Sequence, residues 1–221
     1  SVAPQASLGA GRVVLEFVDG PVAKPVEESV RSHLNTEKRV VRSTTGQLHW
    51  DYSQRGWFTV NTPGTQAVIG FGGGREHRLS DCVIQTDNAF ANVYVNSLDP
   101  GKPISQARAL VITTVARMVD KGTVFDELSD APVERPGRNE AAPLLIEPVQ
   151  ASITLKRTDP CRVLALDHEG RKPAQTVEMA VDKTPEGQRL VLDGAKSKTI
   201  YYVVEFGDGT VLSEGAGSGG R

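Results

Sequence analysis

The sequence predicts an all-β fold, namely an antiparallel β-sandwich of immunoglobulin-like or jelly-roll-like type with one short N-terminal helix. Three observations indicate this class. Apolar and polar residues alternate over many short segments, turn signals separate these segments at spacings of roughly 8–12 residues, and helical patterns do not lie between them. A parallel α/β fold needs such interleaved helices, so it is not expected.

The first part of the chain, residues 1–37, is expected to be an N-terminal extension or connector. It opens with a β-branched run, "GRVVLEFVDG" (11–20), that ends in an Asp-Gly turn signal. The next apolar residues recur at i, i+4 and i+8, which is the spacing of one narrow helical face. They predict a short helix over about residues 25–34, formed by Val26, Val30 and Leu34.

Residues 38–212 carry the period-two pattern and form the expected sandwich domain. In "QLHWDY" (47–52), one face would carry Leu48, Trp50 and Tyr52 and the other Gln47, His49 and Asp51. The predicted strands lie within 38–43, 47–52, 56–62, 66–71, 81–86, 88–99, 107–118, 148–157, 161–170, 175–182, 189–194 and 199–210. Between them, residues 126–143 hold three prolines and no period, which predicts a long loop or hinge. The glycine-rich residues 213–221 are expected to be a flexible tail.

Composition excludes several classes of function. Hydrophobic residues make up 38% of the 221 residues, enough to fill a core, and the net charge of −2 argues against nucleic acid or an anionic membrane surface as a partner. No apolar run has the roughly 20 residues that span a bilayer, and the first residues do not resemble a signal peptide. The two cysteines, Cys82 and Cys161, are predicted to be buried free thiols, with a single disulfide as the alternative if the parent protein is exported.

The sequence shows no recognisable catalytic set. The segment "GFGGGREHRL" (70–79) lacks the helix start or Lys-Ser/Thr of a phosphate loop and predicts a mobile hairpin loop, with Glu76 and His77 as an exposed pair. Histidines and cysteines are not clustered, so neither a metal site nor any cofactor is expected. There is no GxSxG elbow, and no two carboxylates stand out as the pair of a glycosidase.

The aromatic residues near position 50 are the candidate binding site. Sugar rings stack on exposed tryptophan and tyrosine faces, and "YSQRG" (52–56) predicts a hairpin that brings the two tryptophans close together. The candidate carbohydrate-binding residues are Trp57, Trp50, Tyr52 and His49. The alternative is that these rings fill the core with Leu48 and Phe58, and the sequence leaves that choice open.

Five stretches of the chain, from "VVRSTTGQLHWDYSQRGWFTVNTPGTQAVIGF" (40–71) to "KTIYYVVEF" (198–206), resemble a module that follows the catalytic barrel in large bacterial glycoside hydrolases. The resemblance covers about residues 38–206, but the segment from 119 to 143 departs from it, because relatives often carry a tryptophan and a shorter link there. The matching stretches, in order, are "VVRSTTGQLHWDYSQRGWFTVNTPGTQAVIGF" (40–71), "VNSLDPGKPISQARALVITTVAR" (95–117), "PLLIEPVQASITLKR" (143–157), "LALDHEGRKP" (164–173) and "KTIYYVVEF" (198–206).

The resemblance implies a C-terminal β-sandwich domain whose partner is the catalytic (β/α) barrel of the same polypeptide. Residues 8–36 would then be the end of the barrel or the connector, and the parent would be secreted or periplasmic. The catalytic carboxylates of the family lie in the barrel, so no catalytic residue is expected here. Two rival hypotheses remain: a carbohydrate-binding module with a polysaccharide as its partner, and an enzyme with a site in the 126–143 loop.

Overall fold

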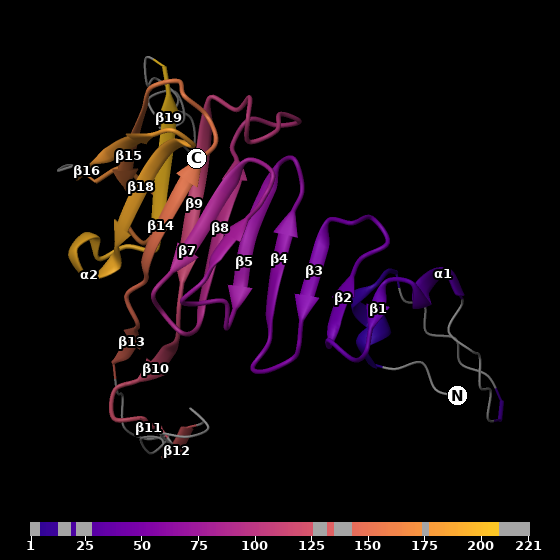
Figure 1. Cartoon of the computed structure of the whole chain (residues 1–221). Helices are drawn as coiled ribbons and strands as arrows, with labels where there is room; N and C mark the ends of the chain where they lie inside the picture. The colour runs from indigo at the N-terminus through magenta and orange to yellow at the C-terminus, as the bar shows by residue number, and fades with distance from the viewer. Residues whose placement is uncertain are drawn as a thin grey trace.

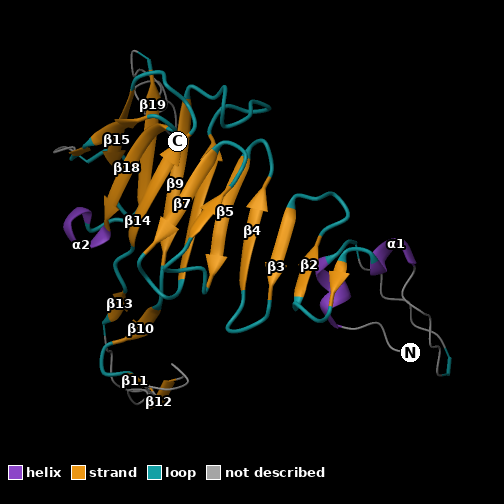
Figure 2. Cartoon of the chain, in the orientation of Figure 1, coloured by secondary structure: helices purple, strands orange, loops and turns teal. Residues whose placement is uncertain are grey.

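The computed structural model describes residues 5–12, 19–20, 28–125, 132–134, 143–173 and 177–207. The all-β prediction is confirmed: strands dominate this part of the chain, and its helical segments are short (Figure 2). They are the 3-10 turn η1 (Gln5–Gly9) and the helices α1 (Glu28–Arg31) and α2 (Gly194–Ser197). Across these ranges, no helix is long and apolar enough to cross a membrane.

The larger of the two main sheets has ten strands within the described ranges, all paired antiparallel. Their spatial order is β1 (Leu34–Asn35), β2 (Val40–Arg42), β3 (Leu48–Asp51), β4 (Trp57–Asn61), β5 (Thr65–Gly70), β8 (Ala91–Ser97), β9 (Ala109–Val115), β19 (Tyr201–Phe206), β15 (Cys161–Ala165) and β16 (Glu178–Met179). The edge strands β1 and β16 have two residues each, which leaves little free edge for another chain to pair with.

The smaller main sheet has five described strands, also antiparallel. Their order is β17 (Val181–Thr184), β18 (Gly187–Asp193), β14 (Gln150–Leu155), β7 (Cys82–Thr86) and β6 (Glu76–Arg78). The described residues also form two ribbons of two strands each. One joins β10 (Met118–Asp120) to β13 (Leu144–Ile146), and the other joins β11 (Val124–Phe125) to β12 (Pro132–Glu134).

The core lies between the small sheet and the part of the large sheet from β5 to β15. It is formed by the alternate residues of each strand, as the period-two pattern requires. Its largest fully buried apolar side chains are Ile84, Ile104, Leu110, Ile112, Ile153, Leu155, Leu190, Leu192 and Tyr202, and of these only Ile104 lies outside a strand. Figure 1 shows that β3, β2 and β1 extend beyond the small sheet, so the large sheet is a single layer there.

The N-terminal segments pack on this single-layer part of the sheet. The predicted helix over 25–34 is present as one turn, α1, and residue 34 already belongs to β1, because Leu34 and Asn35 pair with Val41 and Val40. Val30 and Leu34 pack against the cluster of Ala10 and Val41, but they do so from a helix and a strand and not from one helical face. Residues 25–27, the predicted strand within 11–20, most of the 126–143 loop and the 213–221 tail lie outside the described residues.

The glycine-rich segment 70–79 differs from its prediction. It is a crossover rather than a hairpin loop, because β5 belongs to the large sheet and β6 to the small one. It is also closely packed: a Cβ atom on Gly73 would lie 2.0 Å from the carbonyl oxygen of Asn88. The crossover removes β6 and β7 from the large sheet, so β8 becomes the neighbour of β5.

Candidate functional site

The β3–β4 hairpin divides the four predicted binding residues between the two faces of the large sheet. Trp50 pairs with Phe58 and Asp51 pairs with Trp57, so the two tryptophans are offset by one residue and point to opposite faces. Trp50 and Tyr52 lie on the outer face, away from the small sheet. Trp57 and His49 lie on the inner face, where β6 approaches. The four residues therefore do not form one platform.

The outer-face pair packs against the N-terminal turn. The ring of Trp50 stacks on that of Phe58, with centroids 5.2 Å apart and planes inclined by 5°, and contacts Tyr52 at 4.9 Å. Gly9 of η1 approaches so closely that a Cβ atom there would lie 3.2 Å from Cε3 of Trp50. Trp50 is thus half-buried in a small cluster with Val41.

An apolar groove of about 590 Å³ lies beside this cluster, and we call it the outer groove. Its apolar walls are Leu8, Leu48, Trp50 and Phe58. Leu48 is 42% exposed and Phe58 is 38% exposed, although each is a large apolar side chain. A neighbouring group of exposed apolar side chains on a sheet is typical of a surface that meets another protein.

Trp57 occupies a different environment at the open edge of the sandwich. His49 stacks on its ring with centroids 5.4 Å apart, and the ring of His77 meets it edge-on at 4.7 Å. The guanidinium of Arg75 lies 5.7 Å from the centroid of the same ring. A cleft of about 260 Å³ opens beside it, between the 52–56 hairpin and the 71–75 segment, and we call it the Trp57 cleft.

The glycine-rich crossover builds one wall of the Trp57 cleft. Gly70 has φ +96°, and a Cβ atom there would lie 2.9 Å from the carbonyl oxygen of Gly56, so only glycine fits this close approach of the two loops. The carbonyl oxygen of Gly72 accepts a hydrogen bond of 2.8 Å from Nε2 of His77. His77 is therefore buried and does not form the predicted exposed pair with Glu76, which contacts Arg78 instead.

The ionisable groups around the cleft have shifted pKa values. Burial is the main reason that the pKa values of His49 and His77 lie below their usual 6.5, and the nearby arginines act in the same direction. Burial acts to raise the pKa of Asp51, but the hydrogen bonds from Ser53 and the charge of Arg75 outweigh it and lower that pKa. At pH 7 the histidines are neutral, and the arginines supply the positive charge of the cleft.

We expect the stability of the chain to fall when the pH is lowered from 7.5 toward 5. His49 and His77 are harder to protonate in the folded chain, so the unfolded state binds more protons below about pH 6.5. The stability that they contribute is present above that pH and is lost as the pH falls through their lowered pKa values. Thermal unfolding measured between pH 7.5 and pH 5 should show this decrease in stability. The decrease should be smaller in the variant His77→Gln. An identical pH profile in that variant would contradict the assignment.

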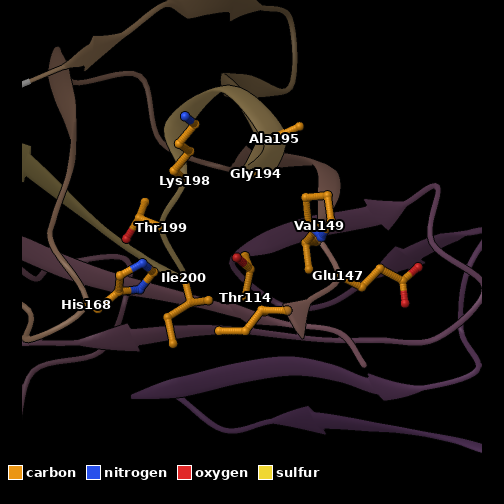
Figure 3. A pocket seen from close by; sticks show the side chains of 11 residues that line it. Thr114, Glu147, Val149, His168, Gly194, Ala195, Lys198, Thr199 and Ile200 are labelled. Carbon is orange, nitrogen blue, oxygen red and sulfur yellow. The ribbon is translucent and has the colours of Figure 1, made fainter. Parts of the chain in front are cut away.

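A second pocket, of about 300 Å³, lies where the start of β19 meets α2 and the end of β9 (Figure 3). Its polar side chains are Thr114, His168, Lys198 and Thr199. Glu147 also lines it, but its carboxylate points away from His168 and Lys198 in Figure 3. That carboxylate accepts hydrogen bonds from Arg117 (2.8 Å) and Asn88 (3.1 Å). The pocket therefore lacks the opposed carboxylates of a glycosidase.

The two thiols are unsuited to nucleophilic catalysis. Both cysteines are free, as the sequence predicts, but only Cys82 is fully buried and Cys161 is half-buried. Burial raises the pKa of Cys82 to about 12 and that of Cys161 to about 11, so both stay protonated at neutral pH. Among the described side chains, no cluster of histidine, cysteine and acidic residues could hold a metal ion.

Comparisons with protein-family models, with curated proteins and with solved structures find no match to this chain. The fold and the clefts define an all-β sandwich with an apolar outer groove and a charged cleft beside a tryptophan.

The sequence did not identify the arginines of the Trp57 cleft. Arg55 lies in the 52–56 hairpin and its guanidinium sits 3.8 Å above the ring of Phe71, while Arg75 follows the glycines of the crossover. Neither position has a local pattern that marks it, because the two loops meet only through the pairing of β4 with β5. The glycine cluster was the one signal of a close approach between backbones.

Proposed function

We propose that this chain is a non-catalytic C-terminal accessory domain of a secreted or periplasmic polysaccharide-degrading glycoside hydrolase. In this proposal it packs on the catalytic barrel of the same polypeptide and supports it. The resemblance over residues 38–206 suggests the parent protein. The observation that carries the proposal is the outer groove, where Leu48 and Phe58 of the single-layer sheet are exposed beside the exposed Leu8 of η1.

A second exposed apolar surface supports docking on another domain. The ribbon of β10 and β13 projects from the sandwich (Figure 1) and exposes four large apolar side chains, Met118, Leu144, Leu145 and Ile146. Soluble domains seldom leave such a group in water, so contact with a neighbouring domain would stabilise it. The position of Leu144, Leu145 and Ile146 within the stretch 143–157, which resembles the glycoside hydrolase module, fits this interpretation.

We predict that Leu48→Ser with Phe58→Ser weakens the contact between this domain and the barrel. Covering the exposed parts of the two side chains at the domain contact is worth about 1–2 kcal/mol in total. When this contribution is lost, protease should cleave the connection between the two domains faster, and the barrel should unfold at a lower temperature. The measurement uses the longer polypeptide in which the proposed barrel domain is joined to the N-terminus of this chain. Val191→Ser is the matched control, because Val191 is exposed on the small sheet.

Two results would count against the accessory-domain proposal. The first is an upstream sequence that encodes no barrel. The second is a double variant that behaves like the control while the isolated 221-residue chain remains folded.

The second candidate function is a carbohydrate-binding module. It is favoured by one observation, namely that Trp57 borders an open cleft together with charged and aromatic side chains. Of the sequence-derived set, Trp57 lines this cleft and His49 stacks on the ring of Trp57. Trp50 and Tyr52 belong to the outer cluster and would not contact the same ligand.

A further inference from the structure

We propose that the Trp57 cleft binds a pyranose ring that carries an anionic group, either a carboxylate or a sulfate ester. This inference rests on the carbohydrate-binding candidate and specifies its ligand. It does not depend on docking to a barrel, since the outer groove lies on the opposite face of the large sheet.

The first argument is the pairing of aromatic and guanidinium groups. Arg55 lies over the ring of Phe71 at 3.8 Å, and Arg75 lies over the ring of Trp57 at the longer distance of 5.7 Å. A ring edge or face next to a guanidinium suits a ligand that has apolar C–H groups beside a negative charge. Sugars that carry uronate or sulfate groups have both features on one ring.

The second argument is the charge of the cleft. Its lining has two arginines and one carboxylate, that of Asp51. Oδ1 of Asp51 already accepts hydrogen bonds from the backbone N–H of Ser53 (2.9 Å) and from its hydroxyl (2.6 Å). Arg75 is exposed and has no ion pair within the described part of the chain. Its guanidinium is therefore available for a bidentate contact with a carboxylate or sulfate.

The third argument is size. The volume of about 260 Å³ is below the roughly 300–1,000 Å³ of pockets for drug-sized ligands. It suits one ring or one side group of a polymer rather than a long stretch of chain. A single-stranded nucleic acid would also offer rings and phosphates, but the net charge of −2 does not favour binding along a phosphate backbone.

The test is affinity gel electrophoresis of the full 221-residue chain in matched polysaccharides. Polygalacturonate is compared with its methyl ester, which has the same backbone without the charges, and carrageenan is compared with agarose. We expect retardation by at least one acidic polymer and none by its neutral counterpart. Retardation by polygalacturonate would indicate a carboxylate on the ligand, and retardation by carrageenan would indicate a sulfate ester.

Variants locate the binding to the cleft. Arg75→Gln should weaken retardation about tenfold or more, since a charge-assisted contact is lost. Trp57→Phe keeps a ring at position 57 in case Trp57→Ala fails to fold, and it should weaken binding less than Arg75→Gln. Arg189→Gln, an exposed arginine on the small sheet, is the control and should leave binding unchanged.

Several outcomes would overturn the inference of an anionic sugar. They distinguish a failure of the anionic specificity from a failure of carbohydrate binding itself. Equal retardation by the charged and neutral polymers, lost in Trp57→Phe, would keep carbohydrate binding and remove the anionic specificity. No retardation by any polymer would remove both. Tighter binding of single-stranded DNA that depends on Arg75 would replace the sugar by a nucleic acid.

Discussion

Replacing Arg162 by leucine should lower the free energy of unfolding by about 3–5 kcal/mol, because it leaves the carboxylate of Glu205 buried without its charged partner. Glu205 lies on the outward side of β19, opposite Ala109 of β9 and Arg162 of β15. Its side chain is 0% exposed. Nε and Nη2 of Arg162 donate to the same carboxylate oxygen, Oε2, at 2.7 Å and 2.6 Å.

The other oxygen of Glu205 adds to this cost. Within the described part of the chain, Oε1 is buried and has no hydrogen-bond partner. The whole stabilisation of the buried charge by hydrogen bonding therefore comes from the contacts of Oε2. The Glu205 side chain is 0% exposed whereas that of Arg162 is 38% exposed, so an apolar residue at 162 removes the donors of Oε2 and leaves the carboxylate buried.

A double-variant cycle separates the ion pair from simple loss of packing. Urea unfolding is measured for Arg162→Leu, for Glu205→Leu and for the two combined. The combined variant should be more stable than Arg162→Leu alone, because a pair of apolar side chains leaves no uncompensated charge. If Arg162→Leu costs less than about 1 kcal/mol, as is usual for a surface ion pair, Glu205 is not buried in solution.

The faces of the large sheet explain what the sequence could and could not predict. Local alternation predicted the strands correctly, for example 47–52 and 56–62, because side-chain direction depends only on the backbone of each strand. Alternation could not predict which face of the sheet is covered by other segments of the chain. Val203 and Leu164 point outward yet are buried, while Phe58 points outward and is exposed. That difference depends on where other segments lie, which alternation does not encode.

The candidate site shows the same limit. The sequence selected Trp57 and His49 as part of an aromatic group on which a sugar ring could stack, and Trp57 lines the cleft while His49 stacks on its ring. It placed Trp50 with them because a hairpin was assumed to bring both tryptophans to one side. The observed register offsets them by one residue, which moves Trp50 to the opposite face. If the pairing of β3 with β4 were shifted by one residue, Trp50 and Trp57 would lie on the same face of the sheet.

We expect Ile153→Ala to cost about 3–4 kcal/mol, near the middle of the range for apolar side chains truncated in a core. β14 is the central strand of the small sheet, between β18 and β7. Ile153 is 0% exposed and points toward the large sheet, where it belongs to the main core cluster. The cavity left by three carbon atoms cannot collapse, because strands on both sides fix the backbone of β14.

The matched control is Val191→Ala on the neighbouring strand. Val191 pairs with Ser152, one residue away from Ile153 in the register, but it is 51% exposed on the other face. Its truncation should stay within about 0.5 kcal/mol, as is usual for surface positions. Urea unfolding of both variants compares two β-branched side chains that differ mainly in the face they occupy. Equal costs would mean that the small sheet does not pack on the large one through the Ile153 face, and the two-layer core would then be wrong.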